Sequence, residues 1–370
     1  MAGDRLSAGI LAQAHCIKCP SEATVCGIDP LRARYCRQCF MQMVKHKFRK
    51  SFGKQRVFRE YGAEPVLVDF DGTHHSVALL HLIRDGQNEA PAKRLVWKPV
   101  VLCIITKLDS DQIAHTSNRL CEVICEFQAT MTLHVCHLAQ IFDSQTERCF
   151  VNGLDVTHVP RLRALLEAVK DKSAAEELLN RLRTKFLYRI AESSQMKRIL
   201  VSAGADVLAK RAFDVMCFGR GAQLHQETAV VDDRAGAGTL LVRPLHDVAV
   251  REAALYNRFA SMLHLVVLPS VQPTDAGAHT ETLHTVTNDF VNRLQATHAA
   301  TIPTLLRTVE KVHASETAAE KCKLCYSHVL PGAATDDEQG RTLCAACHRL
   351  LTVDVPDQTL LPCCLRAQSL

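Results

Sequence analysis

Apolar runs and amphipathic stretches alternate through the middle of the chain. Residues 65–70 form a continuous apolar run with strand character, and residues 77–83 have the pattern of a helix. Further apolar runs occur at residues 100–105, 131–138 and 199–201, and the clearest helical stretches between them are residues 161–168 and 174–190. This alternation predicts a doubly wound α/β core with a mostly parallel sheet.

The composition agrees with a globular protein of more than one unit. The chain has 370 residues, of which 47% are hydrophobic and 22% charged, and this length fits two or three domains. It contains no run of eighteen apolar residues, and its first residues lack the basic start and long apolar stretch of a secretory signal. We therefore expect no membrane span and a cytoplasmic or nuclear location.

Seventeen cysteines in a chain without an export signal indicate metal binding or thiol chemistry rather than disulfides. Eight of them form four Cys-x-x-Cys pairs: Cys16/Cys19, Cys36/Cys39, Cys322/Cys325 and Cys344/Cys347. Sixteen residues separate the two pairs near one end and eighteen separate those near the other, both within the range for a four-thiolate zinc site. The spacing predicts two structural zinc sites, because four thiolates leave no coordination position open.

Other chemistry is compatible with the same cysteines. Each Cys-x-x-Cys pair could be a thioredoxin-like redox motif, or the thiols could be free and buried, although no βαβ pattern surrounds the pairs. Four thiolates also suit an iron–sulfur centre. Cys26 and His348 lie close enough in sequence to replace a ligand.

A basic amphipathic helix is predicted over residues 40–54, directly after the second cysteine pair. Met41, Val44 and Phe48 recur at helical spacing and form its apolar stripe. Its cations are Lys45, Lys47, Arg49 and Lys50, and the segment 45–59 holds seven lysines or arginines and no acid in a chain of net charge +5. This absence of a compensating acid favours contact with RNA phosphates over a solvated basic face.

The loop between the first predicted strand and helix has two interpretations. Such a loop is where α/β nucleotide enzymes bind phosphate. Its residues are Asp71, Gly72, Thr73, His74, His75 and Ser76. They occupy the place of a pyrophosphatase-type ATP loop, Ser-Gly-Gly-x-Asp-Ser, of which only the glycine at 72 and the serine at 76 remain. An aspartate at 71 would repel pyrophosphate, so this interpretation predicts a degenerate loop that does not bind ATP productively.

The second interpretation is a phosphatase. Residues 69–73 are similar to the Asp-x-Asp-Gly-Thr opening of haloacid-dehalogenase-type phosphatases, with Asp69 as nucleophile, Asp71 as general acid and Mg²⁺ between them. Thr106 and the pair Asp232-Asp233 could supply later elements of that family.

The order of motifs along the whole chain resembles the second, non-catalytic subunit of the cytoplasmic tRNA thiolation family. The matching segments are the cysteine pairs at 16–19 and 36–39 with the basic helix, Gly219-Arg220-Gly221, Leu241-Val242-Arg243-Pro244-Leu245, the helix 247–260 with Glu252, Tyr256, Asn257 and Arg258, and the cysteine pairs at 322–325 and 344–347. They extend from residue 16 to residue 347. The phosphatase interpretation explains three short pieces and neither cysteine pattern.

The resemblance implies a degenerate adenine nucleotide α-hydrolase, or PP-loop-like, fold flanked by two four-cysteine zinc modules. It also implies a heterodimer with a catalytic PP-loop subunit that 2-thiolates wobble uridine U34 (mcm5s2U) of tRNA-Lys, tRNA-Glu and tRNA-Gln. Sulfur would come from a thiocarboxylated ubiquitin-like carrier. The present chain would support the partner and hold tRNA in the cytoplasm, away from any membrane.

The chain departs from the catalytic subunit at two places. The block after the strand at 198–201 keeps at most Asp206 of the family's Gly-His-Asn-x-Asp-Asp sequence. Cys217 is the only cysteine between Phe150 and Lys321, and its apolar surroundings predict a buried thiol rather than a sulfur carrier. We therefore expect no catalytic residue and no ATP in this chain, hence a pseudo-enzyme.

We divide the chain into a zinc knuckle with its basic helix (1–60), a degenerate PP-loop-like core (61–260), a helical segment (261–320) and a C-terminal zinc ribbon (321–370). Arg220 and Arg243 are weaker candidates for phosphate contact. The alternatives are a Mg²⁺-dependent phosphatase and a zinc-ribbon RNA-binding adaptor without a thiolation role.

Overall fold

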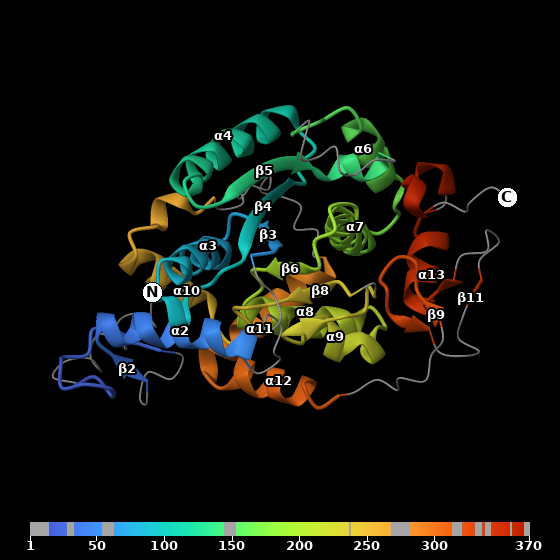
Figure 1. Ribbon diagram of the computed structural model, residues 1–370. Coiled ribbons are helices and arrows are strands. Elements are labelled where there is room, and N and C mark those ends of the chain that lie inside the picture. Colours follow the sequence, from blue (N-terminus) through green and yellow to red (C-terminus); the bar gives the residue numbers. More distant parts are fainter. Residues whose placement is uncertain are drawn as a thin grey trace.

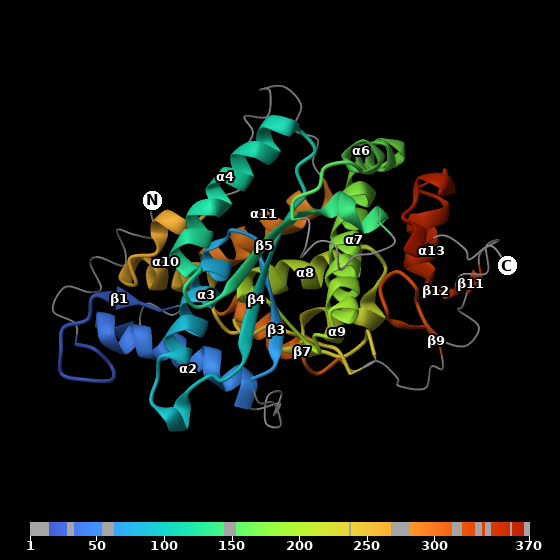
Figure 2. The same ribbon diagram turned by 45° about the horizontal axis from the view of Figure 1, so that its top comes forward.

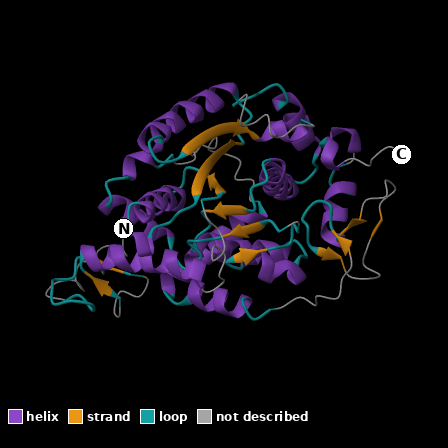
Figure 3. Cartoon of the chain, in the orientation of Figure 1, coloured by secondary structure: helices purple, strands orange, loops and turns teal. Residues whose placement is uncertain are grey.

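A computed structural model describes residues 15–27, 33–53, 63–143, 153–236, 238–267, 282–312, 320–329, 335–336, 342–355 and 357–365. At its centre lies a six-stranded sheet with helices on both sides (Figures 1 and 3). The strand order is β5 (Thr132–His137), β4 (Lys98–Ile105), β3 (Pro65–Phe70), β6 (Arg198–Val201), β8 (Leu240–Val242) and β7 (Val231–Asp232). All neighbours are parallel except β7, which runs antiparallel to β8.

Helices connect the parallel strands as the apolar pattern predicts. The α-helices of this part are α3 (His74–Gln87), α4 (Ser110–Phe127), α6 (Val159–Ala168), α7 (Lys172–Ser193), α8 (Ala205–Cys217), α9 (Leu224–Thr228), α10 (Val250–Phe259), α11 (Leu283–Thr297) and α12 (Thr301–Val309). The side chains of Thr73, Asp109 and Asp171 accept hydrogen bonds from the first turns of α3, α4 and α7, which fixes where these helices begin. Short 3₁₀ helices are Pro91–Lys93, Leu138–Phe142, Gly221–Gln223, Leu263–Leu265, Gln358–Leu360 and Cys363–Leu365.

The two cysteine-rich segments lie at opposite ends of the molecule (Figures 1 and 2). The N-terminal one consists of the hairpin β1 (Val25–Cys26) and β2 (Arg34–Tyr35) followed by α2 (Arg37–Gly53). The C-terminal one contains β9 (Glu320–Lys321), β10 (His328–Val329), β11 (Thr335–Asp336), β12 (Thr342–Leu343) and α13 (Ala345–Thr352). Both are small hairpin-and-helix units that cannot bury a core of their own.

One hydrophobic cluster runs through the sheet into both end segments. It includes Phe40 and Phe48 of α2 as well as Leu324 and Leu350 of the C-terminal segment. The fold class expected from the sequence is confirmed, but the end segments pack on the core, and the boundaries at 60, 260 and 320 stay a prediction. None of the described helices is long and apolar enough to cross a bilayer.

Candidate metal centres and the altered nucleotide loop

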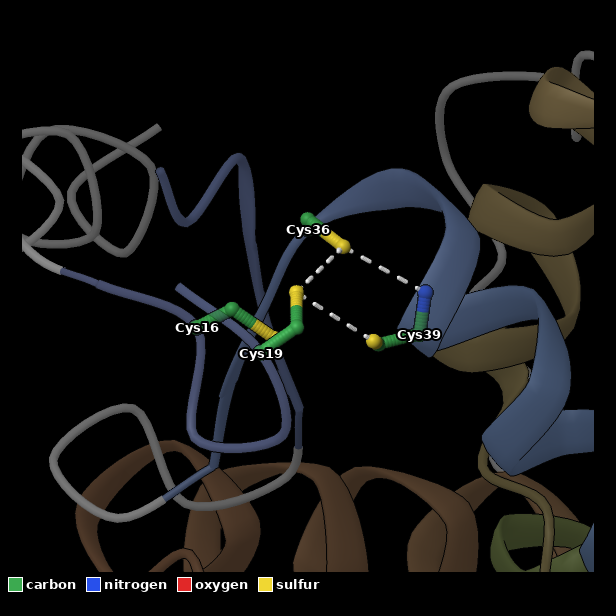
Figure 4. Close-up of side chains that lie close together, drawn as sticks. All are labelled: Cys16, Cys19, Cys36 and Cys39. Carbon is green, nitrogen blue, oxygen red and sulfur yellow. Dashed lines mark hydrogen bonds between the residues drawn. The ribbon is translucent and has the colours of Figure 1, made fainter. Parts of the chain in front are cut away.

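Four sulfur atoms converge at the N-terminal end of the molecule (Figure 4). Cys16 and Cys19 come from the loop before β1, and Cys36 and Cys39 lie at the start of α2. The sulfur of Cys19 is 3.6 Å from that of Cys36 and 3.6 Å from that of Cys39. The backbone N–H groups of Lys18 and Cys39 donate to the sulfurs of Cys16 and Cys36, both at 3.4 Å. The two Cys-x-x-Cys pairs therefore form one site, as the spacing predicts.

The C-terminal cysteines form a second and more deeply buried cluster. Cys322, Cys325, Cys344 and Cys347 are each less than a tenth exposed. The sulfurs of Cys325 and Cys344 are 3.8 Å apart. Tyr326, directly after the first pair, has a positive φ of 61°, and its N–H donates to the carbonyl of Cys322 at 2.9 Å, which closes the turn that holds this pair.

The sulfur spacing fits a single metal ion. Four ligands at 2.3 Å around a tetrahedral centre stand about 3.8 Å from one another. The observed separations of 3.6 to 3.8 Å agree with this value, and within each cluster all four sulfurs lie within 4.8 Å of one another. Both clusters could hold a metal ion, and their four-thiolate donor sets suit zinc. Neither Cys26 nor His348 belongs to a cluster.

The basic face of α2 is ion-paired, contrary to the sequence-based inference that no acid compensates it. Lys45 contacts Asp85 at 2.8 Å, Lys47 contacts Glu252 at 2.6 Å, Arg49 contacts Glu89 at 2.9 Å and Lys50 contacts Asp247 at 3.0 Å. The acids come from α3, α10 and the segments beside them, which are distant in sequence. Only Lys50 is more than half exposed, at 56%. The cations at 54, 56 and 59 lie outside the described residues.

Residues 71–76, which we call the altered loop because they differ from the ATP-loop pattern, lie at the topological switch point of the sheet. The connections from β3 and β6 leave in opposite directions there, and ligands of doubly wound folds bind in that crevice. Asp71 Oδ1 accepts from the backbone N–H and hydroxyl of Thr73 at 3.0 and 2.7 Å, and the Thr73 hydroxyl accepts from the N–H of Ser76. These two donors of Thr73 are therefore satisfied by a carboxylate of the chain itself.

Residues from later segments of the chain also pack against this loop. The ring of His75 is buried, with Nε2 3.1 Å from the carbonyl of Val248, and it lies against Gly204 of the β6–α8 turn. Gly72 has φ +78°, and a side-chain carbon there would come within 2.8 Å of the Val267 carbonyl. The His74 carbonyl accepts from Asn257 at 2.8 Å. Loop residues that differ from the ATP-loop pattern, such as His75, are thus packed parts of the structure.

The phosphatase interpretation fails at its nucleophile. Asp69 is 1% exposed, and both of its oxygens accept from Arg183 of α7. A carboxylate held in this way cannot also bridge Mg²⁺ and attack a phosphoester. Asp232 of β7 is ion-paired to Arg234. Three strands lie between β7 and β4, the strand that ends just before Thr106. The three pieces of the motif are therefore not brought together.

Three other residues singled out in the sequence, Asp206, Arg220 and Arg243, have structural roles or buried positions, and a fourth, Cys217, is exposed. Asp206 accepts from the Val250 N–H and so caps α10. Arg220 and Arg243 are 2% and 7% exposed, too buried for the phosphate contacts considered for them. The prediction of a buried Cys217 is wrong, because this thiol is exposed on the last residue of α8, where the apolar segment 213–218 ends.

A set of buried charges is not among the features predicted from the sequence. Glu177 and Arg181 of α7 are 1% and 4% exposed and ion-paired at 2.7 Å, and they connect to Glu227 and Arg234. Their signal was present, since positions 177 and 181 share the apolar face of the helix with Leu178 and Leu182. Charges at such positions indicate buried ion pairs.

Comparisons with known proteins agree with this architecture. The family model described as cytoplasmic tRNA 2-thiolation protein 2 matches residues 282–349. Two proteins of that name, from Caenorhabditis briggsae and Caenorhabditis elegans, are 29% and 30% identical to this chain; each alignment covers 85% of this chain and 89% of the relative. Among solved structures, the U34-tRNA thiolase NcsA from Methanococcus maripaludis with its [4Fe-4S] cluster has the same fold, with a TM-score of 0.57, 14% identity, and coverage of 86% of this chain and 93% of that one.

Proposed function

Because the chain belongs to the cytoplasmic tRNA 2-thiolation protein 2 family, we propose that it is the non-catalytic subunit of a heterodimeric tRNA sulfurtransferase. The partner is a catalytic subunit with an intact PP-loop. The heterodimer 2-thiolates the wobble uridine U34 of tRNA-Lys, tRNA-Glu and tRNA-Gln, with sulfur from a thiocarboxylated ubiquitin-like carrier. This chain supports the partner and contributes to tRNA binding in the cytoplasm.

The observation that carries the non-catalytic role is the loop at the switch point. Asp71 accepts from Thr73 in the place where nucleotide phosphates bind in folds of this class. An incoming pyrophosphate would have to displace this carboxylate and tolerate its charge. The chain therefore does not adenylate uridine.

Both cysteine clusters hold zinc in a structural role in this proposal. Separations near 3.7 Å suit one ion, whereas a four-iron cluster inserts several irons and sulfides between its thiolates and spreads them further apart. Each site ties a short hairpin to a helix, and four thiolates leave no position for substrate. Metal analysis of the purified chain should return about two zinc equivalents and no sulfide. Sulfide in either site would overturn the assignment.

For tRNA contact we propose Lys45, Lys47, Arg49 and Lys50 of α2. Their ion pairs reduce the free charge of this face, so Lys50, with the most exposed side chain, carries most of the contact. The Lys50–Asp247 pair can exchange its aspartate for a phosphate at little cost, because both of its side chains are about half exposed.

Three measurements test the function together. The purified chain should neither hydrolyse ATP nor exchange pyrophosphate, it should copurify with a protein that has an intact PP-loop, and its deletion should abolish 2-thiouridine in tRNA. Normal 2-thiouridine after deletion would refute the proposal. Unchanged thiolation together with tRNA binding would instead select an RNA-binding adaptor.

A further inference from the structure

A buried ionic network connects the C-terminal cysteine cluster to the α/β core. Its members are Arg181, Arg211, Arg220, Arg234 and Arg243 with Glu177, Glu227 and Asp232. They come from α7, α8, the segment between α8 and β7, β7 and the residues just after β7 and β8. Glu177 accepts from Arg181 and Arg211 at 2.7 and 2.8 Å, and Glu227 accepts from Arg234 at 2.9 Å. Every side chain in the set is at most 18% exposed.

The network reaches the sulfur atoms directly. Arg220 Nη1 donates to Cys347 Sγ at 3.0 Å and lies 3.9 Å from Cys344 Sγ. Gln223 Nε2 donates to Cys344 Sγ at 3.4 Å. Arg220 Nε is 3.3 Å from Glu177 Oε1, so one guanidinium joins a thiolate to a carboxylate. N–H groups aimed at sulfur stabilise the thiolate and therefore the metal-bound form.

Arg234 of the network and the neighbouring Lys185 also contact the backbone and side chains of the C-terminal segment. Arg234 Nη1 donates to the hydroxyl of Ser327 at 3.0 Å, and Lys185 donates to the carbonyl of Lys323 at 2.7 Å. The ammonium of Lys185 also lies over the ring of Tyr326. The segment that carries Cys322 and Cys325 is thus bound to α7 and to Arg234, two residues after β7.

The charges of the network do not balance without the cluster. Among the described residues, five guanidinium groups of this network face three carboxylates, which leaves two positive charges in excess. Uncompensated charge is costly to bury. A divalent ion bound by four thiolates carries two negative charges, which matches the excess. Asp214 and His284, 2.8 Å apart at the edge of the network, add one charge of each sign when His284 is protonated. Lys185 lies outside the ion-paired set, with its ammonium on a carbonyl and a ring.

We propose that the dianionic metal–tetrathiolate complex is the charge partner of this buried arginine network, with Arg220 and Gln223 as positioning residues of the C-terminal site. Metal binding, docking of the C-terminal segment and ordering of the 220–234 region are then one event. The N-terminal cluster differs: three of its four cysteines are partly exposed, and backbone N–H groups donate to its sulfurs. It provides an internal reference within the same chain.

The inference rests on the proposed metal sites, so the zinc content of the unmodified full-length chain is measured first. A chain without metal would overturn the metal assignment itself, whatever the role of Arg220. With two zinc ions present, a competing chelator is titrated in and the release of each ion is followed. The phases are assigned with a Cys16→Ser, Cys19→Ser chain that retains only the C-terminal site.

Arg220→Met should weaken zinc binding at the C-terminal site by about 10- to 100-fold and leave the N-terminal site unchanged. Arg220→Lys, which keeps the charge, should retain most of the affinity. The control is Arg198→Met, which removes another buried arginine whose guanidinium donates to two backbone carbonyls; it should change neither zinc affinity.

Equal affinity at the C-terminal site in Arg220→Met and the unmodified chain would overturn the proposal. So would a lysine variant as weak as the methionine variant, because charge would then not be the operative property. Where Arg220→Met does not fold, Gln223→Leu makes the same comparison with a neutral donor, and its C-terminal site should release zinc at lower chelator concentration than the unmodified chain. Unchanged release from Gln223→Leu refutes the positioning role.

Discussion

Arg183 donates through both terminal nitrogens to the two oxygens of Asp69, at 2.8 and 2.6 Å. This ion pair attaches α7 to the end of β3, directly before the altered loop. It converts a residue that could act as a nucleophile in a sequence motif into a buried structural group. The pair therefore holds the end of β3 against α7, and it leaves neither oxygen of Asp69 free to act as a nucleophile.

Substituting Arg183 by methionine should destabilise the protein by about 3–5 kcal/mol, because it leaves the carboxylate of Asp69 buried without its partner. Urea denaturation followed by circular dichroism measures the loss. Arg119→Met is the control. Arg119 pairs with Glu122 and donates to the His264 carbonyl on the surface, and its loss should cost about 0–1 kcal/mol because the groups left behind remain accessible to water. Similar losses in the two variants would contradict a buried structural pair.

Gly72→Ala should destabilise the loop strongly. Its φ of +78° disfavours any side chain, and the new carbon would meet the Val267 carbonyl. Gly153→Ala is a matched control, because Gly153 has φ +67° and open space around it. The backbone conformation should cost both variants about 1–2 kcal/mol, and the clash should cost Gly72→Ala about 1–3 kcal/mol more. Equal thermal unfolding temperatures would show that the 72–267 contact does not constrain the loop.

Asp247→Asn should raise the affinity for tRNA. It releases Lys50 from a 3.0 Å ion pair on the exposed side of α2, which leaves the ammonium free to contact phosphate. An increase of up to about fivefold corresponds to the free energy of an exposed pair, and the dependence of binding on salt should steepen. Asp111→Asn, an equal charge change at an exposed residue of α4, tests for a general charge effect. If both variants bind tRNA equally, α2 is not the contact surface.

The attachment of α11 should weaken with rising pH. Burial alone would lower the pKa of His284, but its hydrogen bond with Asp214 and the charges of Asp214, Glu177 and Glu176 raise the pKa above the ordinary value of 6.5. The stabilisation is thus fully present below about pH 6.5 and lost as the pH rises through the folded-state pKa. Denaturation between pH 6 and 9 should show this slope, and His284→Gln should remove it. A slope that persists in the variant would assign it to another group.

Much of the candidate site was visible in the sequence, and its errors have specific causes. The cysteine pairs can be predicted because a tetrahedral metal site requires short, regular spacings between its ligands, and such spacings are visible in the sequence. The cations of α2 look uncompensated in the sequence because Asp85, Glu89, Asp247 and Glu252 lie 40 to 205 residues away. The pattern around Cys217 predicts a buried thiol because an apolar segment does not reveal where its helix ends.

The α/β alternation and the two four-cysteine clusters can be predicted from the sequence alone, since each depends on neighbours within about twenty positions. Which charges meet is fixed only when the chain folds. Asp69 pairs with Arg183, the α2 cations pair with acids of α3 and α10, and Arg220 reaches Cys347 across 127 residues. Electrostatic partners are chosen by distance in space and by burial, and neither quantity exists until the chain has folded.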